Sequence, residues 1–137
     1  MISAVLETNV VVSAHLNSEG PAALILDLAL ARHFRLFLSE VLLEEYTGVL
    51  ARARFGLDPH DLRKSIRAIR RAATFVHPRR TLCVTRDIDD NRVVECALEG
   101  RADFIVTGNL RHFPARFQDI RVIPPRQFLT ILASEPC

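Results

Sequence analysis

The sequence predicts an α/β fold with a largely parallel central sheet. Short apolar runs alternate with stretches of helical periodicity, an order typical of strands joined by crossover helices. Two of the apolar runs also end in similar polar segments, Glu7-Thr8-Asn9 and Thr107-Gly108-Asn109. A length of 137 residues favours one domain, which we expect to span residues 1–137.

Five apolar runs predict strands, in chain order at residues 2–6, 35–38, 74–77, 104–106 and 121–123. Each run is short and is bounded by polar or turn-forming residues, as strands usually are. The segment over residues 78–86 shows neither a helical nor a strand period. We therefore expect a loop or an irregular strand there.

Six segments predict helices, in chain order at residues 9–16, 20–33, 39–54, 58–73, 89–100 and 126–134. Pro21 suits the first turn of the second helix, and Ser39 is a good N-cap for the third. Gly100 is expected to be the C-terminal glycine of the fifth helix. Residues 109–113 predict one further helical turn, which Pro114 stops.

Composition excludes several classes of protein. No apolar stretch approaches the ~20 residues that span a bilayer, and no signal peptide is recognisable, so we expect a cytoplasmic protein. The three cysteines, Cys83, Cys96 and Cys137, form no Cys-x-x-Cys pair, and the histidines are scattered. A zinc site is therefore not expected, and the thiols are read as reduced and mostly structural.

The basic residues are almost all arginine, although the net charge is only +2. Arg63, Lys64, Arg67, Arg70 and Arg71 cluster in one predicted helix. Arginine suits bidentate contacts with phosphate, which would make this helix a nucleic-acid contact. A solvated helix face explains the same cluster equally well, and both interpretations stay open.

Helical geometry ranks the acids of the helix over residues 39–54. Successive residues turn by ~100°, which places Glu44 nearly opposite the apolar stripe and Glu45 on its edge. Glu45 is therefore expected to be at least half-buried and to need a partner. An arginine or a backbone amide would satisfy it without any function.

The same test separates the aspartates near residue 90. Asp90 lies on the apolar face at the start of its helix, whereas Asp89 points sideways. Asp87 precedes Asp90 by three residues, so both can face one ion if the turn is helical. The ordinary alternative is that these residues are helix caps.

Polar side chains at the carboxyl ends of two predicted strands complete the pattern. Glu7 follows the first strand directly, where Thr8 and Asn9 are expected to cap the next helix, and Thr107 and Asn109 follow the fourth strand in the same style. Ligands bind at this edge of an open α/β sheet, and gathered carboxylates repel one another unless a cation lies among them. Thr107 and Asn109 would hold a metal-bound water or a phosphate, or else serve turn geometry alone.

Taken in order, these segments resemble a PIN-domain nuclease, and the closest group is the VapC-like toxins of toxin–antitoxin pairs. The resemblance runs nearly end to end and depends on order and spacing rather than on any single motif. Its pieces are Leu6-Glu7-Thr8-Asn9-Val10, residues 39–50 around Glu45, Asp87-Ile88-Asp89-Asp90-Asn91 with Glu95-Cys96-Ala97, residues 102–109, and Pro124-Pro125-Arg126-Gln127-Phe128-Leu129.

The resemblance implies a three-layer α/β/α sandwich whose acidic pocket holds Mg²⁺ or Mn²⁺ and cuts single-stranded RNA. By position, Glu7 takes the family's first-strand aspartate, Glu45 its helix glutamate and Asp90 the aspartate that opens the later helix. Asn109 falls where many members have a further acid. The resemblance also implies a homodimer that is silenced by a small antitoxin protein.

Two departures from the family pattern affect this expectation. Glu7 is one methylene longer than the aspartate it replaces, and Mg²⁺ tolerates little distortion of its octahedron. Asn109 removes a negative charge from the pocket. Both changes predict weaker metal binding and slower cleavage.

The leading hypothesis is therefore a metal-dependent endoribonuclease. Glu7 and Asp90 would bind the ion directly, while Glu45 and Asp87 would hold its waters or a second ion. RNA contacts are assigned to Asn9, Thr107, Asn109, Arg63, Arg67, Arg70, Arg111 and Arg121. An inactive PIN fold that binds RNA or a partner is the alternative. A phosphate-accepting signalling domain is disfavoured, since the only lysine, Lys64, lies in the arginine-rich helix.

Overall fold

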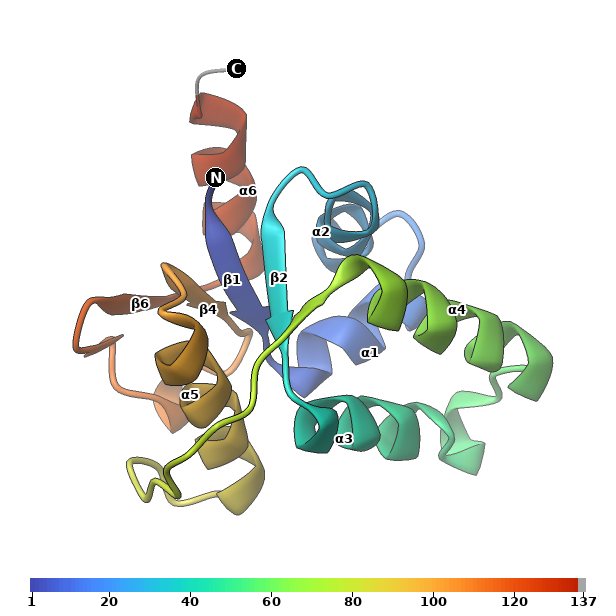
Figure 1. Ribbon diagram of the computed structural model, residues 1–137. Helices are drawn as coiled ribbons and strands as arrows, with labels where there is room; N and C mark the ends of the chain where they lie inside the picture. Colours follow the sequence, from blue (N-terminus) through green and yellow to red (C-terminus); the bar gives the residue numbers. More distant parts are fainter. Residues whose placement is uncertain (136–137) are drawn as a thin grey trace.

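Six strands form one sheet in the computed structural model, which describes residues 1–135 (Figure 1). They are β1 (Ser3–Leu6), β2 (Arg35–Leu38), β3 (Thr74–Phe75), β4 (Phe104–Val106), β5 (Arg116–Phe117) and β6 (Ile120–Ile123). The strand order is β3-β2-β1-β4-β6-β5, and every pair is parallel except β5 with β6. The expected α/β fold is confirmed. Pro136 and Cys137, at the end of the expected domain, lie outside the described residues.

Six α-helices connect and cover the strands: α1 (Thr8–Leu16), α2 (Pro21–Leu30), α3 (Glu40–Leu50), α4 (Pro59–Ala72), α5 (Ile88–Gly100) and α6 (Pro125–Ser134). Helix α5 packs on β1, β2 and β4, while α2 packs against α1, α4 and α6. Right-handed crossovers put these two groups on opposite faces of the sheet. The result is the expected three-layer α/β/α sandwich.

The ends of several elements differ from the prediction for local reasons. Helix α2 stops at Leu30, and Arg32 then adopts a left-handed conformation with a φ of 59°. Helix α3 stops at Leu50, and a separate 3₁₀ turn, η1 (Ala53–Phe55), precedes Gly56. The short strand β5 was not predicted.

Gly100 is not the C-terminal glycine that the sequence predicted. The helix α5 continues through it, and Arg101 takes the left-handed cap position with a φ of 55°. A Cβ atom on Gly100 would lie 2.8 Å from Cγ of Phe37. The glycine is therefore needed for the close approach of α5 to β2.

Aromatic rings and one buried hydroxyl join the layers. The ring of Phe128 on α6 meets Phe34 edge-on at 5.0 Å and Phe104 at 5.8 Å. On α3 the buried Tyr46 hydroxyl donates a hydrogen bond to the Leu6 carbonyl at the end of β1. The ring contacts join α6 to the sheet, and the Tyr46 hydrogen bond joins α3 to the carboxyl end of β1. Among the described residues, no helix is both long and apolar enough to cross a membrane.

The carboxyl ends of β1 and β4 form the switch point of the sheet, since the chain moves to β2 on one side and later returns to β4 on the other. Leu6 is in register with Val106, and the Glu7 amide donates to the Val106 carbonyl at 3.0 Å. Ligands of open α/β sheets bind in the crevice at such a point. Helix α3 lies below this edge in Figure 1, where it contacts both α1 and α5.

Candidate active site

Glu7 lies at the switch point with both carboxylate oxygens hydrogen-bonded. It is the N-cap of α1, because its Oε2 accepts the Asn9 amide at 2.8 Å, while its Oε1 accepts the Thr107 hydroxyl at 3.1 Å. The prediction that Thr8 and Asn9 cap this helix was therefore wrong. The side chain is buried, and burial raises the pKa of Glu7; the two hydrogen bonds oppose that shift and the charge of Asp90 adds to it.

Glu45 is half-buried on α3 and accepts a hydrogen bond from the Thr8 hydroxyl. This agrees with its predicted place on the edge of the apolar stripe, and Glu44 is exposed as predicted. Burial raises the pKa of Glu45 to about 7; the Thr8 hydroxyl opposes the shift, and the carboxylates of Asp89 and Glu7 increase it. Glu45 and Glu7 are thus close enough to repel each other.

Asp90 contributes an unsatisfied carboxylate oxygen in the first turn of α5. The residue is 9% exposed, and its Oδ2 atom is buried without a hydrogen-bond partner. Nδ1 of His112 lies 3.4 Å from that oxygen, which is beyond normal hydrogen-bond length. Burial raises the pKa of Asp90, Asp87 raises it further, and His112 lowers it. Such an orphaned oxygen calls for a cation or a donor.

The two neighbouring aspartates make different contacts. Asp87 is the N-cap of α5, with its Oδ1 accepting the amides of Asp89 and Asp90 at 2.7 and 3.3 Å, so the capping alternative holds for it. Asp89 was predicted to point sideways, yet its carboxylate lies within hydrogen-bonding reach of Glu45. Sequence reasoning missed Asp89 because its partner comes from α3, which no periodicity within α5 reveals.

A groove is lined by Asp87 and Asp90. Its volume is about 910 Å³, and its walls come from residues 83–87 and from the turn after β4. Arg111, which was predicted to contact RNA, lines this groove together with Arg86 and His112. The groove therefore joins carboxylates and guanidinium groups, a combination suited to a metal ion and a phosphodiester.

Thr107, Asn9 and Asn109, which were predicted to contact the substrate, lie in different surroundings near the switch point. Thr107 is fully buried; besides donating to Glu7, its hydroxyl accepts the Asn109 amide at 2.9 Å, so it also serves turn geometry. Asn9 and Asn109 line a second cavity of about 620 Å³ between α1 and the start of α2. None of these three side chains lines the groove beside Asp90.

The arginines of α4 lie apart from that groove. Arg63, Arg67 and Arg70 are exposed, and α4 packs against α2 and α3. Arg70 forms a bidentate ion pair with Glu40 at 2.7 and 3.0 Å and lies over the Phe75 ring. Arg121 on β6 lies over the ring of Phe104 on β4. The structure thus brings Arg111 to the acids, but not these four residues.

The donor set suits a hard divalent cation, although the side chains are not closed around one. Within residues 1–135, no group of three or more His, Cys, Asp or Glu is arranged to hold a metal ion. Glu7 and Glu45 instead accept hydrogen bonds from hydroxyl and amide groups, and Asp90 lies beside His112. Yet the free acceptors are carboxylate oxygens, which Mg²⁺ and Mn²⁺ prefer. Burial and the charges of neighbouring carboxylates raise the pKa values of Glu7, Glu45 and Asp90, and a bound cation would oppose both effects.

Comparison with known proteins agrees with this geometry. A model of the PIN domain family matches residues 3–111, a range that includes β1, α3, α5 and β4 and hence every acid of the cluster. A search of curated proteins returned no match. PIN domains are generally nucleases that use divalent metals. By this match, with which the fold agrees, the chain belongs to the PIN domain family.

Proposed function

We propose that this protein is a metal-dependent endoribonuclease that hydrolyses phosphodiester bonds of single-stranded RNA in the cytoplasm, with Mg²⁺ or Mn²⁺ as its cofactor. The observation that carries the proposal is the buried Oδ2 of Asp90, which has no hydrogen-bond partner among the described residues and has the His112 imidazole at 3.4 Å. It lies in a cluster with Glu7 and Glu45, which come from two other elements, and it borders a groove lined by Arg86 and Arg111.

Glu7 and Asp90 would hold the ion directly, and Glu45 and Asp87 would hold its waters. Asp89 joins this set through its contact with Glu45. The chemistry that a bound divalent ion would supply there is polarisation of the scissile phosphate and activation of a water as nucleophile. A divalent charge also stabilises the carboxylates that burial and repulsion disfavour.

The chain's own contacts orient these groups. The Asn9 amide and the Thr107 hydroxyl hold the two oxygens of Glu7, so the carboxylate needs little reorganisation to bind a ligand. Guanidinium groups of Arg86 and Arg111 in the groove would bind the phosphodiester next to the cleaved bond. These arginines supply positive charge where the transition state becomes more negative.

The test is RNA cleavage in Mn²⁺ by matched variants. Asp90→Asn and Glu45→Gln keep the shape of the side chain but remove its charge, and we expect each to slow cleavage by about 10²-fold or more. Glu44→Gln is the matched control, because Glu44 is the exposed neighbour of Glu45 on α3. EDTA should abolish cleavage by the wild type. Cleavage that survives both EDTA and Asp90→Asn would refute the proposal.

We further propose that the protein is the toxin of a toxin–antitoxin pair and acts as a homodimer. The support is the VapC-like order of its motifs, with a small antitoxin expected to cover the acidic cluster. Expression of the wild type should arrest growth of a host cell, while Asp90→Asn should not. Co-expression with the product of a short neighbouring reading frame should restore growth, and growth arrest that is equal for wild type and Asp90→Asn would contradict the toxin role.

A catalytically weakened PIN fold that binds RNA or a partner is the second candidate. It is favoured by Glu7, which replaces the family's aspartate and has both oxygens already hydrogen-bonded. This candidate would be supported if the protein bound RNA in EDTA but showed neither Mn²⁺-dependent turnover nor a calorimetric signal for Mn²⁺ binding. Clear turnover in Mn²⁺ that Asp90→Asn removes would eliminate it.

A further inference from the structure

The loop over residues 78–86, here called the strap, is fastened along α5. Its backbone amides donate to side chains of the helix at three points. The bonds run from Arg79 to Glu99 at 3.1 Å, from Leu82 to Glu95 at 2.7 Å and from Thr85 to Asn91 at 2.8 Å. The acceptors are four residues apart, so they share one face of α5. The strap therefore runs antiparallel to α5 as a defined ridge rather than as a loose loop.

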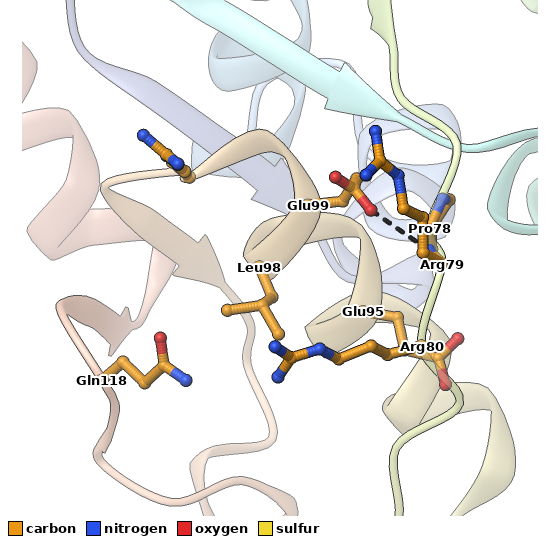
Figure 2. A pocket seen from close by; sticks show the side chains of 8 residues that line it. Pro78, Arg79, Arg80, Glu95, Leu98, Glu99 and Gln118 are labelled. Carbon is orange, nitrogen blue, oxygen red and sulfur yellow. Dashed lines mark hydrogen bonds between the residues drawn. The ribbon is translucent and has the colours of Figure 1, made fainter.

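An arginine-lined cavity lies at the first end of the strap (Figure 2). It has a volume of about 360 Å³, and Arg79, Arg80 and Arg101 are among the residues that line it. In the described part of the chain, none of these three guanidinium groups has a carboxylate within ion-pairing distance. The two carboxylates in the wall, Glu95 and Glu99, already accept strap amides, and Glu95 also pairs with Arg92. Three arginines and two glutamates therefore line this cavity, and within residues 1–135 none of the three arginines is ion-paired.

The strap connects this cavity with the acidic cluster. A second hollow of about 410 Å³ is lined by Arg79, Arg80 and Arg92 together with Glu40 and Glu95. At the other end, residues 83–87 line the groove that contains Asp90. The distance along α5 between Glu99 and Asn91 is about 12 Å at 1.5 Å per residue. Arg79 and Arg80 thus lie at one end of the strap and Arg86 at the other, in the groove that contains Asp90, and in the described residues none of the three is ion-paired.

We propose that the strap is the track for the RNA backbone. On this proposal, which rests on the proposed ribonuclease function, an RNA strand crossing the acidic cluster continues along the strap. One of its phosphates enters the cavity formed by Arg79, Arg80 and Arg101. Arginine binds phosphate through paired donors, and single-stranded nucleic acids are held chiefly in basic grooves that follow the backbone. The substrate is therefore extended single-stranded RNA rather than a mononucleotide.

The arginines of α4 are the competing track and provide the matched control. Arg63 and Arg67 are exposed like Arg79 and Arg80, so the two double substitutions remove the same charge from equally accessible sites. Arg79 and the α5 helix are joined through the Arg79 backbone amide, which a side-chain substitution leaves in place. Thermal unfolding should be unchanged in both double variants.

The experiment measures binding of an RNA of about 12 nucleotides by fluorescence anisotropy, with EDTA present to stop metal-dependent cleavage. We expect Arg79→Gln with Arg80→Gln to weaken binding by about 10-fold at low salt. Loss of two phosphate contacts should also reduce the slope of log K against log salt by about 1.4. Arg63→Gln with Arg67→Gln should change the affinity by less than about twofold.

A second readout uses Cys83, an exposed thiol that lines the groove. In the wild type, RNA should slow the modification of Cys83 by a thiol reagent, and in the strap variant it should slow it less. The modification is measured on the Cys83 peptide by mass spectrometry. The proposal would be overturned if the strap variant kept the RNA affinity of the wild type, or if the α4 variant lost more affinity than the strap variant. It would also be overturned if the strap variant bound an acidic peptide more weakly but RNA equally well. Since binding is measured without cleavage, a protein that binds RNA along the strap but never cuts it would refute only the ribonuclease function.

Discussion

Thr107 donates a hydrogen bond from its hydroxyl to Oε1 of Glu7 at 3.1 Å, across a separation of 100 residues. The parallel pairing of β1 with β4 creates this contact by placing Leu6 beside Val106, immediately before the two residues. Both side chains are buried. The bond therefore fixes the orientation of a carboxylate that burial alone would tend to protonate.

Thr107→Val should weaken metal binding while largely preserving the fold. The substitution keeps the shape of the side chain but removes the donor to Glu7 and the acceptor for the Asn109 amide. We expect about 10-fold weaker Mn²⁺ affinity by calorimetry and a loss of about 1 kcal/mol in the free energy of unfolding. Thr107→Ser retains the hydroxyl and should behave like the wild type. A loss in Thr107→Ser but not in Thr107→Val would show that the methyl group, not the hydrogen bond, matters.

Glu7→Asp should raise Mn²⁺-dependent cleavage. It restores the residue that the family pattern carries, and aspartate is also a favourable N-cap for α1. Because a ligand displaced by about 1 Å can cost 10²-fold in rate, we expect a gain of about 10-fold or more. Glu7→Gln keeps the length of glutamate but removes the charge, so it should lower the rate. A slower Glu7→Asp enzyme would mean that the longer side chain is adapted to its site.

Local sequence signals predicted most of the fold. The strands at residues 35–38 and 104–106 and the Ser39 cap match the structure, because short apolar runs and capping side chains act over a few residues. The same signals misassigned Gly100, whose reason is the Phe37 ring on a distant strand. They also gave no sign of β5, which has two residues and depends on pairing with β6.

The burial of individual acids in the candidate site was predictable, because it depends on the helix that carries each acid. Helical periodicity alone put Glu45 on the edge of its stripe and Asp90 on the inner face of α5, and both are so placed. Contacts between elements were not predictable. The pairing of Asp89 with Glu45 and the approach of His112 to Asp90 depend on how α3, α5 and the turn after β4 meet.

Glu45 should make stability depend on pH near neutrality when no metal is present. Its pKa is about 7 in the folded protein and 4.5 in the unfolded chain, so between these values the folded state binds more protons. Stability should then rise as pH falls from about 7 toward 4.5, and fall as pH rises through 7. The effect is expected to be on the order of 1 kcal/mol, since water screens a half-buried side chain.

Urea unfolding at several pH values in EDTA measures this dependence. Glu45→Gln should flatten it, and Glu44→Gln, on the exposed side of α3, should leave it unchanged. Burial also raises the pKa of Glu7 and Asp90, so a smaller dependence of the same sign should remain in Glu45→Gln. A full dependence in Glu45→Gln would assign the effect to those two acids.

Gly100→Ala should destabilise the fold even though alanine favours helices. The added Cβ would lie 2.8 Å from Cγ and 2.9 Å from Cδ2 of Phe37, a buried ring that has little room to move. Overpacking of this kind costs about 1–3 kcal/mol, which exceeds the gain of about 1 kcal/mol from helix propensity. Gly48→Ala is the matched control within α3, because nothing lies within 4 Å of its Cβ position. It should stabilise the protein by about 0.5–1 kcal/mol in the same urea experiment. If Gly100→Ala were as stabilising as Gly48→Ala, the close packing of α5 on β2 would not be the reason for this glycine.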